Sequence, residues 1–229
     1  GRSVRAVLAF LFQNGKAPSN QFTITEGDAK DCGTVWGEST VDVIITSPPY
    51  ATALPYLDTD RLSLCYLGLL SRPTHRARDK AMIGNREVTE KQRSLYWQRY
   101  EAQRSELPAA ICELIDKIER LNEGTGVGFR RRNLPALLSK YFFDMKDVIK
   151  GMKLALKPGC VAFVVVGNNH TIAGGQHVDI QTASLLNDIA ASVGFEVASS
   201  LSMEMLVSRD IFKKNAMGSE EILAFKKPA

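Results

Sequence analysis

The sequence predicts an α/β fold with an open, mostly parallel sheet that is interrupted by a basic, largely helical insertion. Residues 41–46 (VDVIIT) and 161–166 (VAFVVV) are continuous apolar runs, as expected of buried strands in a parallel sheet. Amphipathic helical patterns over 134–156 and 180–193 indicate helices that cover such a sheet on both faces. Residues 61–140 hold 16 Lys and Arg against 9 Asp and Glu, a net charge of +7 in a chain whose total is +4.

The composition is that of an ordinary globular protein, with 45% hydrophobic and 24% charged residues among 229. No apolar run is long enough to span a bilayer, and no signal segment opens the chain. The four cysteines and three histidines have no metal-ligand spacing, which favours free thiols in a reducing cytoplasm and no metal centre.

The first half of the chain contains three predicted elements. Residues 4–12 have the pattern of the end of a buried helix, followed by the turn-forming pair Asn14-Gly15. Because Gly1 opens directly into this pattern, we expect a further segment before it. Residues 22–25 are a short strand candidate that ends at 26–28. The run 41–46 is predicted as a central strand, ended by Pro48, which lacks an N–H for the sheet.

The insertion and the second half follow in order. Residues 90–120 favour helix, with a break at Pro108. Residues 122–133 (NEGTGVGFRRRN) are predicted as a mobile loop, and the helix of 134–156 ends at Lys157-Pro158-Gly159. The strand 161–166 leads into 167–169, Gly194 closes the helix of 180–193, and 195–206 and 221–226 are the last strands.

Three of the predicted strands end in polar or glycine-bearing segments. These segments are residues 27–28, 47–50 and 167–168. In an open parallel sheet, ligands bind beyond the carboxyl ends of the strands. We therefore expect the three segments to share one site.

Thr46-Ser47-Pro48-Pro49-Tyr50, placed directly after a buried strand, resembles the amine-pocket motif of DNA N4-cytosine and N6-adenine methyltransferases. The resemblance implies that Ser47 Oγ and the Pro48 carbonyl accept hydrogen bonds from an exocyclic amine, that Pro49 keeps the turn rigid, and that Tyr50 stacks on a base rotated out of the duplex. These four residues, Ser47 to Tyr50, are the predicted catalytic set.

The resemblance extends along most of the chain outside the insertion. It implies a class I methyltransferase-like, Rossmann-like sheet whose last two strands form an antiparallel hairpin. It also implies S-adenosylmethionine as the cofactor, without a metal. The predicted cofactor-binding residues are Asp28, Ala29, Thr46, Gly167 and Asn168.

One part of the family pattern is absent from the sequence. The glycine-rich cofactor loop is not found, and the glycines at 124, 126 and 128 do not follow an apolar strand. We therefore interpret the chain as the C-terminal portion of the enzyme, lacking its first βαβ unit. We expect this unit before Gly1 or on another polypeptide, and we expect the chain to be inactive alone.

The basic segment predicts a nucleic-acid surface. The expected division is a partial catalytic core over 1–60 and 134–229 and a target-recognition region over 61–133. The predicted contacts to DNA are Lys91, Arg99, Arg130, Arg131 and Arg132.

The resulting function is methyl transfer to a flipped base of duplex DNA in a bacterial, archaeal or phage-encoded modification system, with no membrane partner. Ser at the first motif position favours cytosine N4 over adenine N6. Two alternatives stay open: an RNA base N-methyltransferase, and a non-catalytic nucleic-acid-binding fragment.

Overall fold

The fold is taken from a computed structural model, which describes residues 22–51, 56–85, 88–124, 127–198, 200–204 and 219–229, together with residue 9. The helix predicted over 4–12 and the turn at Asn14-Gly15 lie outside the described residues. So do positions 205–206 of the strand predicted over 195–206.

The main sheet has five described strands, β1 (Val41–Thr46), β2 (Leu156–Gly167), β5 (Glu196–Val197), β6 (Leu201–Glu204) and β7 (Ser219–Lys226). β1 pairs with β2 in parallel, and β7 pairs antiparallel with β2 on one side and with β5 and β6 on the other. A parallel pair followed by an antiparallel closing hairpin is the α/β, Rossmann-like arrangement that the sequence predicts.

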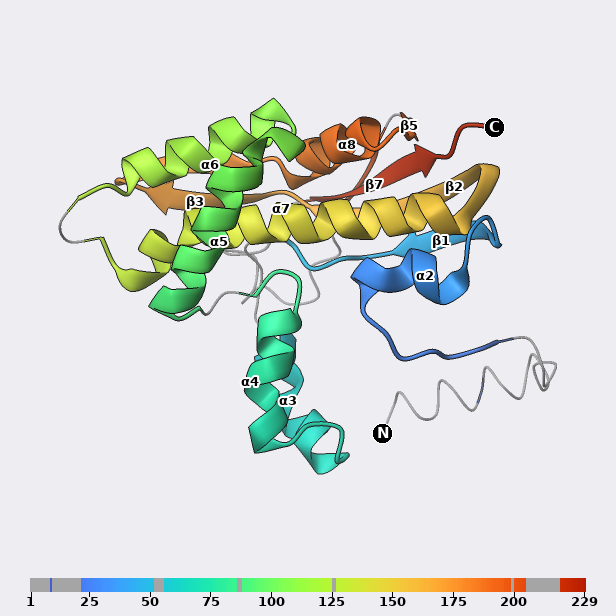
Figure 1. Ribbon diagram of the computed structural model, residues 1–229, viewed down its shortest axis with the longest axis horizontal. Coiled ribbons are helices and arrows are strands. Elements are labelled where there is room, and N and C mark those ends of the chain that lie inside the picture. Colours follow the sequence, from blue (N-terminus) through green and yellow to red (C-terminus); the bar gives the residue numbers. More distant parts are fainter. Residues whose placement is uncertain are drawn as a thin grey trace.

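Helix α7 (Phe129–Ala155) is the long central helix and packs against β2 and five other helical elements (Figure 1). It begins earlier than predicted, so Arg130, Arg131 and Arg132 lie in its first turns and not in a loop. Pro135 lacks the N–H that would bond to the Arg131 carbonyl four residues before it. Asn122 Nδ2 donates to that carbonyl at 2.9 Å instead, so the helix extends past the proline at no cost in hydrogen bonds.

Helices α5 (Glu90–Gln103) and α6 (Ala109–Leu121) pack on α7 and are joined by the short 3₁₀ turn η2 (Arg104–Glu106). Thr89 and Gln92 form a capping box at the start of α5, and Pro108 precedes α6, as predicted. Ile111, Ile115 and Ile118 recur at helical spacing and are fully buried, so α6 is held by one apolar face.

Helices α3 (Tyr56–Tyr66) and α4 (Arg72–Ala81) lie side by side and project away from the sheet (Figure 1). Helix α8 (Thr182–Ser192) contacts β2 and β7 and is closed by Gly194 at φ +85°, as predicted. A separate hairpin of β3 (Asn169–Ala173) and β4 (Gln176–Ile180) turns at Gly174-Gly175, a two-glycine signal for such a turn.

The described sheet is covered well on one face. Ile44, Ala162, Val164, Leu223 and Phe225 point to the helices and are buried. On the other face the strands are only partly buried, in contrast to the expectation of cover on both faces.

Strand β1 is the terminal strand of the described sheet and not a central one, and its Val43 and Ile45 side chains are 50% and 75% exposed. The strand predicted over 22–25 is not formed, because nothing in the described chain pairs with it, and a strand needs a partner for its backbone groups.

Candidate active site

The Ser-Pro-Pro-Tyr turn leaves the carboxyl end of β1. Ser47 is exposed, Pro48 is buried, and Pro49 and Tyr50 are half-buried. The Tyr50 hydroxyl donates to Glu220 Oε1 at the start of β7. This hydrogen bond spans 170 positions of sequence and fixes the direction of the Tyr50 ring.

The segment after α4 packs directly on this turn. A Cβ placed on Gly84 would lie 3.0 Å from Pro49 Cβ and 3.4 Å from the Tyr50 carbonyl oxygen. Gly84 also has φ +77°, a conformation that favours glycine. Two independent requirements, space and backbone conformation, therefore select glycine where the insertion meets the turn.

A cavity of about 260 Å³ lies between β1, α7 and helix α2 (Cys32–Trp36), which follows the 3₁₀ turn η1 (Ala29–Asp31). Three of the predicted cofactor residues, Asp28, Ala29 and Thr46, line it together. The rest of its wall is mostly apolar: Gly27, Thr25, Cys32, Val35, Trp36, Ile44, Ile45, Val148 and Met152. A flat apolar group with one polar edge fits such a cavity.

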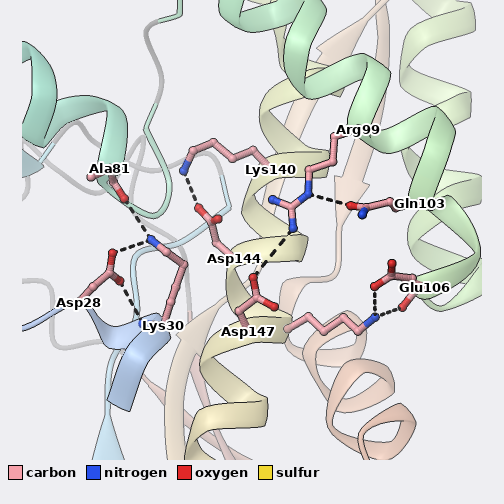
Figure 2. Close-up of polar contacts among 10 residues, drawn as sticks. Asp28, Lys30, Ala81, Arg99, Gln103, Glu106, Lys140, Asp144 and Asp147 are labelled. Atoms are coloured by element: carbon pink, nitrogen blue, oxygen red, sulfur yellow. Dashed lines mark hydrogen bonds and ion pairs between the residues drawn. The ribbon is translucent and has the colours of Figure 1, made fainter. Parts of the chain in front are cut away.

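Asp28 supplies the acidic group of the cavity. It caps η1, with its Oδ1 accepting the Lys30 backbone N–H at 3.0 Å and its Oδ2 lying 2.8 Å from Lys30 Nζ (Figure 2). Partial burial works against ionisation of Asp28, but the hydrogen bonds and charge of Lys30 outweigh it and lower its pKa. The side chain is therefore a carboxylate at neutral pH, which can accept hydrogen bonds and cannot donate them.

Two lysines bind the end of α4 to this region, and Figure 2 shows the contact of Lys30 with Ala81. Lys30 Nζ donates to the Ala81 carbonyl at 3.4 Å, and Lys140 Nζ donates to the Met82 carbonyl at 2.9 Å. Lys140 also pairs with Asp144 on α7, and both side chains are 10% exposed or less. Burial raises the pKa of Asp144, although the charge of Lys140 opposes the change.

Gly167 and Asn168 lie at the end of β2 but are not among the residues lining the cavity. The Asn168 side chain accepts the Ala183 N–H at 3.0 Å, at the start of α8, and donates to Glu221 at 2.7 Å. These contacts hold β2, α8 and β7 together at this end of the sheet.

The predicted DNA contacts fall into two groups. Lys91, Arg130, Arg131 and Arg132 are exposed near the starts of α5 and α7, which are joined by Arg93 Nε donating to the Arg132 carbonyl at 3.1 Å. Arg99 lies further along α5, with its guanidinium 4.5 Å from the Phe143 ring centroid and 3.9 Å from Asp147.

Two curated proteins are similar to the chain in sequence. Type II methyltransferase M.AvaI of Nostoc sp. strain PCC 7120 and the protein of the same name from Anabaena variabilis are each 32% identical over 161 residues. The chain is homologous to these type II methyltransferases. The match covers 68% of the chain, which spans 31% of the length of each relative.

The other comparisons add less about the family of the chain. No protein-family model matches the chain. Two crystal structures of TTHA0409 from Thermus thermophilus, a candidate DNA modification methylase, cover 89% of the chain at 14% and 16% identity with TM-scores of 0.41 and 0.44. They match 51% and 54% of that protein, and the second is a complex with S-adenosyl-L-methionine.

Sequence reasoning missed three residues that contact the candidate site, namely Lys30 beside Asp28, Gly84 beside Pro49 and Glu220 beside Tyr50. Only Gly84 had a local signal, a glycine at the end of a helical pattern. Within the described ranges, no group of three His, Cys, Asp or Glu side chains is arranged to hold a metal ion. None of the described helices combines the length and apolar character needed to cross a membrane.

Proposed function

We propose that the chain carries the target-amine pocket of a DNA amino-methyltransferase and part of the pocket for the adenine of S-adenosylmethionine. The observation that supports this most is the position of Thr46. It lines the cavity together with Asp28 and Ala29, and it is bonded directly to Ser47. A ligand in the cavity would therefore lie beside the turn proposed to hold the amine.

The lining of the cavity fits the adenine end of the cofactor. Its apolar walls suit a ring system, and the Asp28 carboxylate can accept a hydrogen bond from an exocyclic amino group. When bound, S-adenosylmethionine supplies a methyl group held on a positively charged sulfur. The glycine-rich loop expected to hold the rest of the cofactor is absent from the sequence, so we propose a further segment or a second polypeptide for that role.

The turn itself provides the acceptors. An exocyclic amine is a poor nucleophile because its lone pair is delocalised into the ring. If Ser47 Oγ and the Pro48 carbonyl accept hydrogen bonds from its two N–H groups, the nitrogen becomes pyramidal and its lone pair points at the methyl donor. Pro48 and Pro49 have few backbone alternatives, so these acceptors are held in position before the substrate arrives.

Tyr50 is proposed to hold the base. Its hydroxyl donates a hydrogen bond to Glu220. This contact orients the ring through the hydroxyl and does not involve the ring face. A base rotated out of the duplex could then stack on the ring face. The net charge of +7 over 61–140, and the exposed arginines within it, favour a polyanionic substrate.

The target is proposed to be cytosine N4 in preference to adenine N6. The proposed division keeps a partial catalytic core over 1–60 and 134–229 and a target-recognition region over 61–133. The proposal also keeps the cofactor-binding role predicted for Gly167 and Asn168. It likewise keeps the DNA contacts predicted for Lys91 and Arg99.

Single-turnover methylation by the full-length gene product tests the assignment. Ser47→Ala removes one acceptor and should lower the methyl-transfer rate by about 10²–10³-fold, with little change in DNA affinity. Tyr50→Ala should weaken base binding by about 1–3 kcal/mol, whereas Tyr50→Phe retains the ring face. Nucleoside analysis of the product identifies N4-methylcytosine or N6-methyladenine.

Phe22→Ala is the control, because Phe22 is an aromatic residue that is 78% exposed, lies outside the proposed target-recognition region and does not line the cavity. Full activity in both Ser47→Ala and Tyr50→Ala would show that the Pro-Pro turn is only structural. Methylation of RNA but not DNA by the unaltered protein would replace the proposed substrate, and no methylation of either would favour a binding fragment.

A further inference from the structure

A second cavity of about 260 Å³ lies beside Ala51, the residue that follows Tyr50. Its lining comes from four separate parts of the chain: Ala51, Asn85, the first turns of α7 and the start of β3. It shares no lining residue with the cavity of Asp28 and Thr46. It is therefore a separate site on the described molecule.

This cavity is connected to the Ser-Pro-Pro-Tyr turn by two of its own lining residues. Ala51 continues the chain from Tyr50, and Asn85 follows Gly84, which packs on Pro49 and on the Tyr50 carbonyl. Both Ala51 and Asn85 are buried. An occupant of the cavity would thus lie next to whatever Tyr50 holds.

The chemistry of the lining is that of a nucleotide site. Arg130 and Arg131 supply guanidinium groups, whose planar fork matches a phosphate. Leu134, Leu137 and Ala51 supply an apolar wall for a sugar or a base face. Asn85, Asn169, His170 and Thr171 supply polar groups, and no acidic side chain lines the cavity.

The volume sets a limit on the occupant. Pockets for drug-sized ligands and cofactors are about 300–1,000 Å³. At about 260 Å³ this cavity suits one nucleotide and is small for a complete cofactor.

Arg132 differs from its two neighbours although it lies in the same part of α7. It does not line the cavity, and its Nη2 donates to the Val127 carbonyl at 3.4 Å. All three arginines are exposed at the surface. Of these three consecutive arginines, Arg130 and Arg131 therefore line the cavity and Arg132 does not.

We propose that the second cavity binds one nucleotide of the DNA strand adjacent to the flipped base, with its phosphodiester on Arg130 and Arg131. The inference rests on the proposed function, and it assigns the position of the strand relative to Tyr50. Arg132 contributes only unspecific attraction to the DNA backbone.

The test compares three single variants of the full-length gene product, Arg130→Ala, Arg131→Ala and the matched control Arg132→Ala. Binding is measured with a duplex in which one phosphate at a time is replaced by a neutral methylphosphonate. The unaltered protein and Arg132→Ala should lose affinity at one linkage next to the target base. Arg130→Ala and Arg131→Ala should bind the normal duplex about 10-fold or more weakly and be insensitive to that one replacement. Circular dichroism melting checks that all three variants fold.

Equal losses in the three arginine variants would overturn the inference, as would a scan in which no single linkage stands out. Methylation by the unaltered protein in the same experiment keeps the two proposals separate. If the unaltered protein methylates DNA but no single methylphosphonate replacement changes its affinity, only the proposed nucleotide site is refuted. If methylation is absent while one linkage responds to Arg130 and Arg131, the nucleotide site stands and the proposed activity fails.

Discussion

Lys30 contacts two parts of the molecule with one ammonium group. It pairs with Asp28 in the candidate adenine cavity and donates to the Ala81 carbonyl at the end of α4 (Figure 2). Because the lowered pKa of Asp28 depends on Lys30, the ionisation of the cavity and the placement of α4 are coupled through one residue.

Lys30→Met should therefore raise the pKa of Asp28, measured from its carboxyl carbon shift in an NMR titration. The contribution of Asp28 to stability is present above its unfolded pKa of about 3.9 and is lost as the pH falls through the lower folded value. In the variant, whose folded pKa lies closer to the unfolded one, this contribution should be smaller and its loss should be complete at a higher pH. Lys91→Met, at an exposed position on α5, is the control. An unchanged Asp28 titration in Lys30→Met would contradict the assigned cause.

At the scale of elements, the segment that follows α4 meets the Ser-Pro-Pro-Tyr turn at Gly84. This contact is local, yet it links the projecting α3 and α4 helices to the Ser-Pro-Pro-Tyr turn. The chain offers a matched comparison, since Gly159 has φ +78° but no heavy atom within 4 Å of an added Cβ.

Gly84→Ala and Gly159→Ala should each lose about 1–2 kcal/mol of unfolding free energy, because an L-residue is strained in the left-handed region. Only Gly84→Ala should also slow methyl transfer in the full-length gene product, since its new methyl group displaces Pro49. Urea denaturation and single-turnover rates measure the two effects. Equal rates in the two variants would mean that the contact with Pro49 does not position the turn.

The elements predicted best were those with a strong local pattern. The runs 41–46 and 161–166 form strands. Helices α5, α6 and α8 also form where their own residues predict them, with a proline before α6 and a glycine after α8. The start of α7 was predicted too late, because the glycines and arginines of 122–133 were interpreted as a loop, whereas the helix begins at Phe129 and the contact of Asn122 with the Arg131 carbonyl supports its first turns. The strand at 22–25 was predicted from its residues alone, and no pairing partner is found among the described strands.

For the molecule as a whole, one face of the described sheet is only partly buried, and the outer edge of β1 has no neighbour among the described strands. Ile45 is 75% and Trp36 48% exposed, and both line the cavity of Asp28. A binding pocket normally encloses most of its ligand. This cavity is open at the side where β1 has no neighbour in the described sheet.

We therefore expect the 229-residue chain to bind S-adenosylmethionine weakly or not at all, and the full-length gene product to bind it. Isothermal titration calorimetry on both proteins measures the difference. Asp28→Asn in the full-length product should weaken binding, because the amide exchanges one acceptor oxygen for a donor. Micromolar binding by the 229-residue chain would refute the expectation.

The site was predictable where its residues adjoin a strand and hidden where they come from distant sequence. Thr46 lies at the end of β1 and lines the cavity, as strand-end reasoning predicts, whereas Asp28 and Ala29 line it although the strand expected before them is not formed. Glu220 reaches Tyr50 across 170 positions, and Lys140 reaches Met82 across 58. No local pattern indicates such pairs, because each depends on how β7 and α7 pack in three dimensions.

Because the exposed Trp36 lines the cavity, tryptophan fluorescence can report ligand binding there. The sequence contains two tryptophans, and the second, Trp97, is half-buried on α5 with its indole N–H bound to Glu101 at 3.0 Å. In a Trp97→Phe variant of the 229-residue chain, all indole emission would come from the wall of the cavity, so even the weak binding expected of this chain would be detectable. A purine that stacks there would quench it, so occupancy of this cavity could be followed in real time without a labelled ligand.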